Sequence, residues 1–161
     1  MDIRRVAFDH PDAVKLDDEV RLEYIKLYGP EDGGDATPLD ATMFDPPHGI
    51  YLIAYDGETG EPLATGGWRS QEDNPEGYAD GDAELKRMYV VPRARGRGLA
   101  RLILAALEDD ARSAGRDRMV LSTGSAQPEA IALYASSGYA PATPFGHYRH
   151  HDDVRCFAKA L

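Results

Sequence analysis

Two glycines within a run of arginines form the segment of this sequence with the clearest capacity for chemistry. Residues 95–100 read Arg-Gly-Arg-Gly-Leu-Ala, and residues 85–107 contain no Asp or Glu. Because Gly96 and Gly98 have no Cβ, backbone N–H groups there can approach an anion closely. A helix predicted to begin at Gly98 adds unpaired N–H groups and the positive end of its dipole. The segment therefore predicts a phosphate-binding turn.

Arginine side chains in the same segment predict further contacts with an anion. Arg95, Arg97 and Arg101 can each form bidentate, charge-assisted hydrogen bonds to phosphate. The whole chain is acidic, with a formal net charge of −10, which argues against general binding to nucleic acid or to anionic membranes. A solvated charged face is the simplest alternative explanation of the arginines. A nucleic-acid-binding domain built on them is a weaker one.

Two common phosphate-binding motifs do not fit this segment. A P-loop requires Gly-Lys followed by Ser or Thr, whereas Leu99 and Ala100 follow Gly98. A Rossmann fingerprint follows the first strand of a βαβ unit, whereas this turn follows the fourth predicted strand. The turn therefore belongs to a different architecture.

Patterns of strands and helices place the turn within a mixed sheet. The strand, helix and strand that follow residue 84 imply a right-handed crossover and a parallel pair, and a hairpin over residues 50–69 adds antiparallel strands. We therefore expect an α/β (α+β) fold with a mixed, mostly antiparallel sheet of about six or seven strands and about four helices. The predicted strands are 3–8, 50–55, 62–69, 84–91, 118–123, 139–142 and 154–159, and the predicted helices are 11–28, a short one near 39–44, 98–113 and 127–136.

Length and composition are those of one domain, spanning residues 1–161. A chain of this size buries roughly 68–70% of its unfolded surface. No apolar run approaches the about 20 residues that cross a bilayer, and the N-terminus lacks the apolar segment of a signal peptide. Cys156 is the single cysteine and cannot close an intrachain disulfide. We therefore expect a cytoplasmic protein.

Two elements of the sequence together resemble the GNAT superfamily of acyl-CoA-dependent N-acetyltransferases. The family signature is Arg or Gln, any two residues, Gly, any residue, then Gly or Ala, and residues 95–100 match it directly after a predicted strand. The second element is a helix with Leu133-Tyr134 shortly before Gly138-Tyr139. Both elements occur in the family's order, and the specific match spans about residues 84–139.

The resemblance implies that the two parallel strands splay apart and that acetyl-CoA (coenzyme A) enters the gap as co-substrate, with no metal. Backbone groups of residues 88–90 would pair with the pantetheine arm, and N–H groups of residues 96–101 would hold the diphosphate. Gln127 stands where family members often have a cofactor-contacting Asn. The expected cofactor-binding residues are Met88, Tyr89, Val90, Arg95, Gly96, Arg97, Gly98, Leu99, Ala100, Arg101 and Gln127.

Transfer of an acetyl group to a primary amine by direct attack requires a base, an oxyanion donor and an acid. The N–H of Val90 is the candidate oxyanion donor. Tyr134 is the candidate general acid for the leaving thiolate; a core-facing tyrosine is the alternative. Glu84 is the candidate general base, because a carboxylate in a partly buried cleft has a raised pKa. Its alternatives are a solvent-facing glutamate or an acceptor that arrives neutral and needs no base.

Polar residues near the C-terminus could suggest a metal site, because His147, His150 and His151 lie beside Asp152 and Asp153. We interpret them as a polar connection between two strands, since such sequential ligands do not fit one tetrahedron. Cys156 on a predicted strand is interpreted as a small apolar filler.

The sequence gives the least information about the function of the loops and about the partners of the protein. The long loop over residues 29–49 is a candidate cover for the acceptor site. Acidic residues in the segments 31–45 and 70–82 are interpreted as solvated surface, with attraction of a cationic amine as the alternative. The expected partner is an amine of a small molecule or peptide, and the resemblance is compatible with a homodimer. A non-catalytic acyl-CoA-binding or regulatory domain of the same fold is the main functional alternative.

Overall fold

A computed structural model describes residues 1–30 and 39–161, in which seven strands form one mixed sheet. The strand order is β1-β2-β3-β4-β5-β7-β6, and the pairing of β4 with β5 is parallel whereas the other five pairings are antiparallel. This arrangement confirms the predicted fold class. The elements are β1 (Asp2–Arg5), α1 (Pro11–Tyr28), η1 (Ala41–Phe44), β2 (Gly49–Tyr55), β3 (Pro62–Gln71), β4 (Asp82–Val90), η2 (Pro92–Ala94), α2 (Leu99–Ser113), β5 (Arg118–Gly124), α3 (Pro128–Ser136), β6 (Ala140–Pro141) and β7 (Val154–Ala160).

Three α-helices, rather than about four, accompany the sheet in the described ranges. The short helix predicted near residues 39–44 is a 3-10 turn, in which the Asp40 carboxylate accepts a hydrogen bond from the N–H of Thr42 at 2.9 Å. The first strand ends at residue 5 instead of 8, and Phe8 packs its ring against Phe44 at 4.7 Å. The proposed acceptor-site cover falls partly on residues 31–38, which lie outside the described residues.

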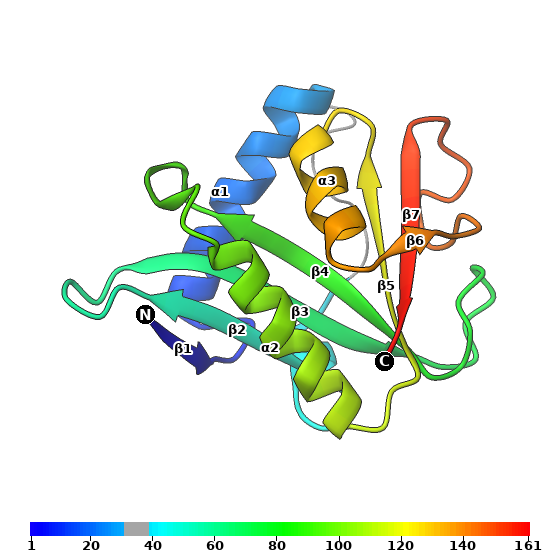
Figure 1. Cartoon of the computed structure of the whole chain (residues 1–161), viewed down its shortest axis with the longest axis horizontal. Helices are drawn as coiled ribbons and strands as arrows, with labels where there is room; N and C mark the ends of the chain where they lie inside the picture. The colour runs from blue at the N-terminus through cyan, green and yellow to red at the C-terminus, as the bar shows by residue number, and fades with distance from the viewer. Residues whose placement is uncertain (31–38) are drawn as a thin grey trace.

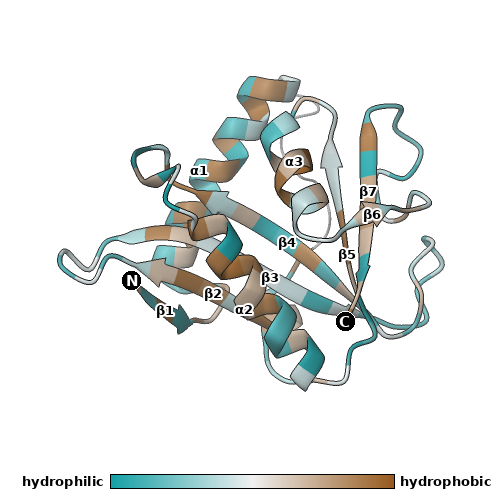
Figure 2. Ribbon diagram, viewed as in Figure 1, coloured by the Kyte–Doolittle hydropathy of each residue, from teal (hydrophilic) through white to brown (hydrophobic). Residues whose placement is uncertain are grey.

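Helices α1 and α2 cover opposite faces of the sheet. From β3, the indole N–H of Trp68 donates to Asp110 of α2 at 2.8 Å, while on the other face Arg87 of β4 pairs with Asp17 of α1. Figure 1 shows α2 in front of the sheet and α1 behind it. Hydrophobic residues concentrate along α2, α3 and the strands, whereas the loops are mostly hydrophilic (Figure 2). In the described ranges no helix is both long and apolar enough to span a membrane.

Strands β4 and β5 separate soon after they pair, as the family resemblance implies. Their pairing covers only residues 82–84 and 118–120, although β4 continues to Val90 and β5 to Gly124. Figure 1 shows the two strands diverging as a V, with α3 over the opening. The edge of β4 is therefore open along residues 85–90 on the side of β5.

A β-bulge in β4 accompanies this separation. The register between β3 and β4 shifts so that Arg87 and Met88 oppose Gly66, and Arg87 has a φ of 59°. Bulges bend a strand and increase its local twist, which directs β4 away from β5. A Cβ on Gly66 would lie 2.4 Å from the Met88 sulfur, so a larger residue there would require the Met88 side chain to move.

Candidate functional site

Two adjoining cavities lie at the opening between β4 and β5. The large cavity, ≈ 690 Å³, lies between α1, the end of β4, the turn before α2 and the start of α3. The small cavity, ≈ 260 Å³, lies between α1, β5 and the connection from β6 to β7. Tyr24 and Gln127 line both cavities. One side chain from α1 and one from the start of α3 therefore form the boundary between the two spaces.

The glycine turn gives the large cavity a group of open backbone donors. Gly96 and Gly98 have φ values of 80° and 77°, and no atom lies within 4 Å of where either Cβ would be. The first bond of α2 runs from the N–H of Leu102 to the carbonyl of Gly98 at 3.1 Å. No described residue accepts a hydrogen bond from the amides of residues 96–101. This geometry fits an anion such as a diphosphate.

Arg95 connects the glycine turn to β4 and α1. Its Nε donates to the carbonyl of Val90 at 3.0 Å, and its Nη2 pairs with Glu23 of α1 at 2.5 Å. The guanidinium also lies over the ring of Tyr89, 5.8 Å from the ring centroid. Arg95 was expected to contact phosphate through two donors. In this structure its Nε and Nη2 instead bind the Val90 carbonyl of β4 and Glu23 of α1.

The other two arginines also contact protein atoms. Arg101 donates to the hydroxyl of Ser136 at 2.7 Å and so joins α2 to the end of α3, and Arg97 donates to the carbonyl of Arg93 at 3.4 Å. The side chain of Leu99 is buried, which leaves only its amide to face an anion. The backbone, rather than the arginine side chains, is therefore the part of the turn that is open to a ligand.

The backbone of β4 presents the N–H of Val90 to the opening, whereas the Val90 carbonyl already accepts a hydrogen bond from Arg95. The N–H of Val91 donates to the carbonyl of Leu63 on β3 at 2.9 Å. Because hydrogen-bonding direction alternates along an antiparallel pair, the N–H and carbonyl of Val90 point away from β3, toward the space that β5 has left. Met88, Tyr89 and Val90 all line the large cavity. The edge of β4 can therefore accept an extended ligand, and the N–H of Val90 is available as a donor.

Tyr134 of α3 lines the large cavity, although only 6% of it is exposed. Burial raises the pKa of its phenol, and the nearby Tyr24 adds to the effect, so the group is protonated at neutral pH. No described residue hydrogen-bonds its hydroxyl. Its ring packs edge-on against Tyr139 at 5.7 Å, and the hydroxyl of Tyr139 donates to Glu108 at 2.7 Å. The Tyr134 phenol is thus oriented by packing and keeps its proton for donation.

Glu84 is held in a buried network rather than in an open cleft. Only 2% of the residue is exposed, and its carboxylate accepts hydrogen bonds from Arg69 at 2.8 Å, Gln71 at 3.0 Å and Tyr78 at 2.7 Å. Burial alone would raise its pKa, but Lys86, Arg69 and the Tyr78 hydroxyl outweigh burial and lower it. The expected raised pKa is therefore wrong, because the cations around this carboxylate stabilise its ionised form.

The lowered pKa of Glu84 predicts a pH-dependent contribution to stability. Since the pKa is lower in the folded than in the unfolded chain, ionised Glu84 stabilises the fold above about pH 4.3, and this contribution is lost as the pH falls through the folded pKa. We expect Glu84→Gln to lower the free energy of unfolding by about 3 kcal/mol at neutral pH, because it removes a buried carboxylate that pairs with Arg69. Denaturant unfolding at several pH values measures both effects.

The control for Glu84 is Glu61→Gln. Glu61 forms an ion pair with Arg93 in which both side chains are 56% exposed, so its loss should cost less than about 1 kcal/mol. The loss of unfolding free energy in Glu84→Gln should shrink below about pH 4.3, because the unfolded wild-type chain then takes up a proton at Glu84 before the folded chain does. A difference in unfolding free energy between Glu84→Gln and wild type that stays constant down to pH 3 would contradict the lowered pKa of Glu84.

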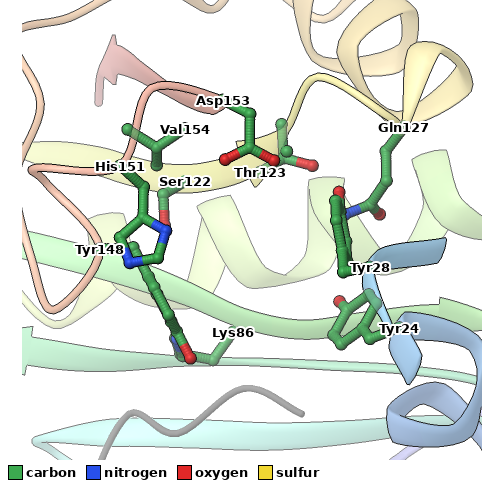
Figure 3. A pocket seen from close by; sticks show the side chains of 11 residues that line it. Tyr24, Tyr28, Lys86, Ser122, Thr123, Gln127, Tyr148, His151, Asp153 and Val154 are labelled. Carbon is green, nitrogen blue, oxygen red and sulfur yellow. The ribbon is translucent and has the colours of Figure 1, made fainter. Parts of the chain in front are cut away.

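Side chains of α1 and α3 meet across the opening at the boundary of the cavities. The Gln127 amide donates to the hydroxyl of Tyr28 at 3.0 Å, and Figure 3 shows these two side chains facing each other. A Cβ on Gly124 would lie 1.9 Å from the Tyr28 oxygen, so a larger residue there would require the Tyr28 side chain to move. The Gln127 amide, expected to contact a cofactor, is bonded to Tyr28 in this structure.

Most of the small cavity was missed by reasoning from sequence. Tyr148, His151 and Asp153 come from a segment interpreted only as a polar connection, and no spacing in the sequence connects them with α1 or β5. The tyrosines at positions 24 and 28, one helical turn apart at the end of a predicted helix, were the one available signal. In the described part of the chain no group of three or more His, Cys, Asp or Glu residues could hold a metal ion.

Comparison with known proteins identifies the family that has these features. The model of the acetyltransferase (GNAT) family matches residues 14–139. The chain belongs to the GNAT family. It is therefore an N-acetyltransferase, and acetyl-CoA is the acetyl donor that the family uses. The matched region contains the glycine turn, the open edge of β4 and the helix that carries Tyr134.

Individual relatives agree with this family assignment. An uncharacterized N-acetyltransferase of Schizosaccharomyces pombe is 33% identical over 140 residues, which are 82% of this chain and 80% of the relative. The IAA acetyltransferase of Azospirillum brasilense is 47% identical over 68 residues, which are 42% of this chain and 44% of that protein. The crystal structure of a Klebsiella pneumoniae protein assigned as an acyl-CoA N-acyltransferase is 28% identical, with a TM-score of 0.79, and the match covers 99% of this chain and 97% of that one.

The family match ends at residue 139, before β6, β7 and their connection. The wall of the small cavity formed by Tyr148, His151, Asp153 and Val154 thus lies beyond it. The family match therefore covers the lining of the large cavity, whereas part of the wall of the small cavity lies after it.

Proposed function

We propose that this enzyme transfers the acetyl group of acetyl-CoA to a primary amine of a small molecule or peptide by direct attack in a ternary complex. The diphosphate of acetyl-CoA rests on the amides of residues 96–101, and its pantetheine arm lies along residues 88–90. The acceptor enters the small cavity from the other side of the opening. The observation that carries this proposal is the boundary shared by the two cavities at Tyr24 and Gln127, because both reactants can meet there without an intermediate on the protein.

Each chemical step has a group in reach of the acetyl-CoA site. The amine nitrogen attacks the thioester carbonyl carbon, and the N–H of Val90 stabilises the oxyanion that forms. The carbon–sulfur bond then breaks, and the thiolate takes the proton of the Tyr134 phenol. The amine loses one proton to water in the small cavity, from which Tyr134 is protonated again. Holding both reactants in one opening supplies much of the rate.

Glu84 has a different role in this proposal from the one suggested by sequence. Its carboxylate already accepts three hydrogen bonds and its pKa is lowered, which makes it a weak base at neutral pH. We assign it a positioning role: it fixes Arg69, Gln71 and Tyr78 through its hydrogen bonds. An acceptor amine that arrives neutral, or that loses its proton to water, requires no dedicated base.

Release of coenzyme A with a panel of primary amines tests the proposed function. Initial rates measured over both substrate concentrations should give intersecting lines, as a ternary complex requires. The protein incubated with acetyl-CoA alone should show no added acetyl group by mass spectrometry. Parallel lines together with a stable acetylated protein would contradict direct transfer.

Cys156 provides a separate test of direct transfer, because it is the single thiol in the chain. It is buried, and burial raises the pKa of its thiol, an effect that the N–H of Phe145 only partly opposes. Such a thiol is a poor nucleophile at neutral pH. We expect Cys156→Ala to keep turnover within about twofold of wild type in the coenzyme A release assay, since the reaction does not need it. A loss of turnover by a folded variant would reveal a covalent intermediate.

A further inference from the structure

The small cavity contains one carboxylate among the described residues that line it, that of Asp153. No described residue forms a hydrogen bond or an ion pair with this side chain, and the residue is exposed. Its main-chain carbonyl, in contrast, accepts a hydrogen bond from Ser125 at 2.9 Å, and the next residue, Val154, pairs with Gly124. A rigid backbone at the end of the β5–β7 pairing thus presents an unpaired negative charge to the acceptor space.

Aromatic rings flank this carboxylate. In Figure 3 Tyr28 of α1 and Tyr148 of the β6–β7 connection stand on opposite sides of the cavity, with Asp153 above the space between them. Burial raises the pKa of the Tyr28 phenol, the Gln127 hydrogen bond opposes this, and the Asp153 charge adds to the increase, so the two groups interact electrostatically. Faces of aromatic rings attract cations. The carboxylate and the rings therefore favour the same kind of ligand group, an ammonium.

The positive groups of the cavity lie apart from Asp153 or are already balanced. Lys86 is buried on β4 and lowers the pKa of Glu84, so its charge is balanced at least in part by that carboxylate. Figure 3 shows the Lys86 side chain directed toward Tyr148, away from Asp153. The ring of His151 contacts Tyr148 at 5.2 Å. An ammonium group beside Asp153 is therefore next to an unpaired carboxylate and away from the positive charge of Lys86.

We propose that Asp153 binds a second ammonium group of the acceptor, so that the enzyme prefers primary amines that carry another cation. This inference rests on the proposed function and specifies the acceptor class. The reacting amine lies at the boundary formed by Tyr24 and Gln127, and the second ammonium lies at Asp153. The cavity volume of ≈ 260 Å³ is below the about 300–1,000 Å³ of pockets for drug-sized ligands, which favours a short diamine or one basic side chain.

Matched acceptors test the preference directly. Putrescine is compared with n-butylamine, and lysine amide with norleucine amide, by coenzyme A release. We expect kcat/KM for the dicationic member of at least one pair to exceed that of its partner about tenfold, which corresponds to about 1.4 kcal/mol. A preference confined to putrescine identifies free diamines as the acceptor class, and one confined to lysine amide identifies basic amino acids or peptides.

Asp153→Asn should remove this preference, mainly through a higher KM for the dicationic acceptor and with little change in kcat. Asp152→Asn is the matched control, because Asp152 is an exposed neighbour that does not line the cavity, and it should keep the wild-type preference. Calorimetry of putrescine and lysine amide with the coenzyme A-loaded protein gives a readout that does not need turnover.

The outcomes separate the two proposals. Turnover without a dicationic preference in wild type, or with the full preference retained in Asp153→Asn, overturns the role of Asp153 and leaves the proposed function intact. Binding of a dicationic amine that depends on Asp153, with no coenzyme A released from acetyl-CoA, supports the inference and contradicts the proposed transfer. The absence of both binding and a dicationic preference overturns the inference.

Discussion

Replacement of Gly98 by Asp is expected to abolish acetyl-CoA binding while the protein stays folded. Gly98 has a φ of 77° and caps the N-terminus of α2, so a side chain there strains the turn and a carboxylate repels the diphosphate at the amides that would hold it. We expect the dissociation constant to increase at least about 100-fold, which corresponds to about 2.7 kcal/mol. Isothermal titration calorimetry with acetyl-CoA measures this loss.

Gly115→Asp is the matched control for Gly98→Asp. Gly115 follows α2, has a φ of 79° and likewise has no atom within 4 Å of its missing Cβ. The control therefore adds the same charge and similar backbone strain without lining the large cavity. Both variants should lose similar thermal stability, and only Gly98→Asp should lose acetyl-CoA binding. Equal affinity in the two variants would refute the assignment of the diphosphate to this turn.

Replacement of Tyr134 by Phe should lower turnover strongly and leave acetyl-CoA affinity within about threefold of wild type. The variant keeps the packed ring and removes only the hydroxyl that donates to the thiolate. General acid catalysis contributes typically about 10²–10⁴-fold, so we expect kcat to fall at least about 100-fold. Because burial raises the pKa of Tyr134, the wild-type acid stays protonated through neutrality, and the pH profile below pH 8 should show no ionisation of this group.

Tyr139→Phe separates catalysis from packing in this experiment. Tyr139 is buried and contacts the ring of Tyr134, but its hydroxyl donates to Glu108, which also pairs with Lys159 at 2.9 Å. Loss of this hydroxyl should lower stability by about 1 kcal/mol and change kcat little. If Tyr134→Phe keeps full turnover, or if both variants lose turnover equally, the phenol of Tyr134 is not the acid.

Local sequence patterns were sufficient to predict the fold and the backbone geometry of the glycine turn. The run of residues 95–100 specified backbone amides, glycine conformations and a helix N-terminus, all of which are formed by residues adjacent in the chain. Helix α2 begins within one residue of its predicted start because glycine and an apolar stripe mark that boundary. Backbone geometry of this kind depends on neighbours in sequence, and sequence therefore predicts it well.

The pKa of Glu84 depends on side chains that no pattern of neighbouring residues in the sequence reveals. The raised pKa was expected from partial burial alone, whereas Arg69 and Gln71 reach the carboxylate from β3 and Tyr78 reaches it from a loop. The sign of a pKa shift results from the balance of burial and charge. Since each of these partners is at least six residues away in the chain, only the folded arrangement determines that balance.

By itself the sequence determined the fold class and the strand–turn–helix unit that we propose binds a diphosphate. The tertiary structure alone decided the small cavity, in which we propose that the acceptor binds: it placed Tyr28 of α1 against Gly124, and it brought Asp153 from beyond the family match into the same cavity. The physical reason is that backbone donors at a turn come from consecutive residues, whereas a cavity wall combines side chains from distant segments. Its shape and charge therefore exist only after the sheet has opened and α1 has packed across it.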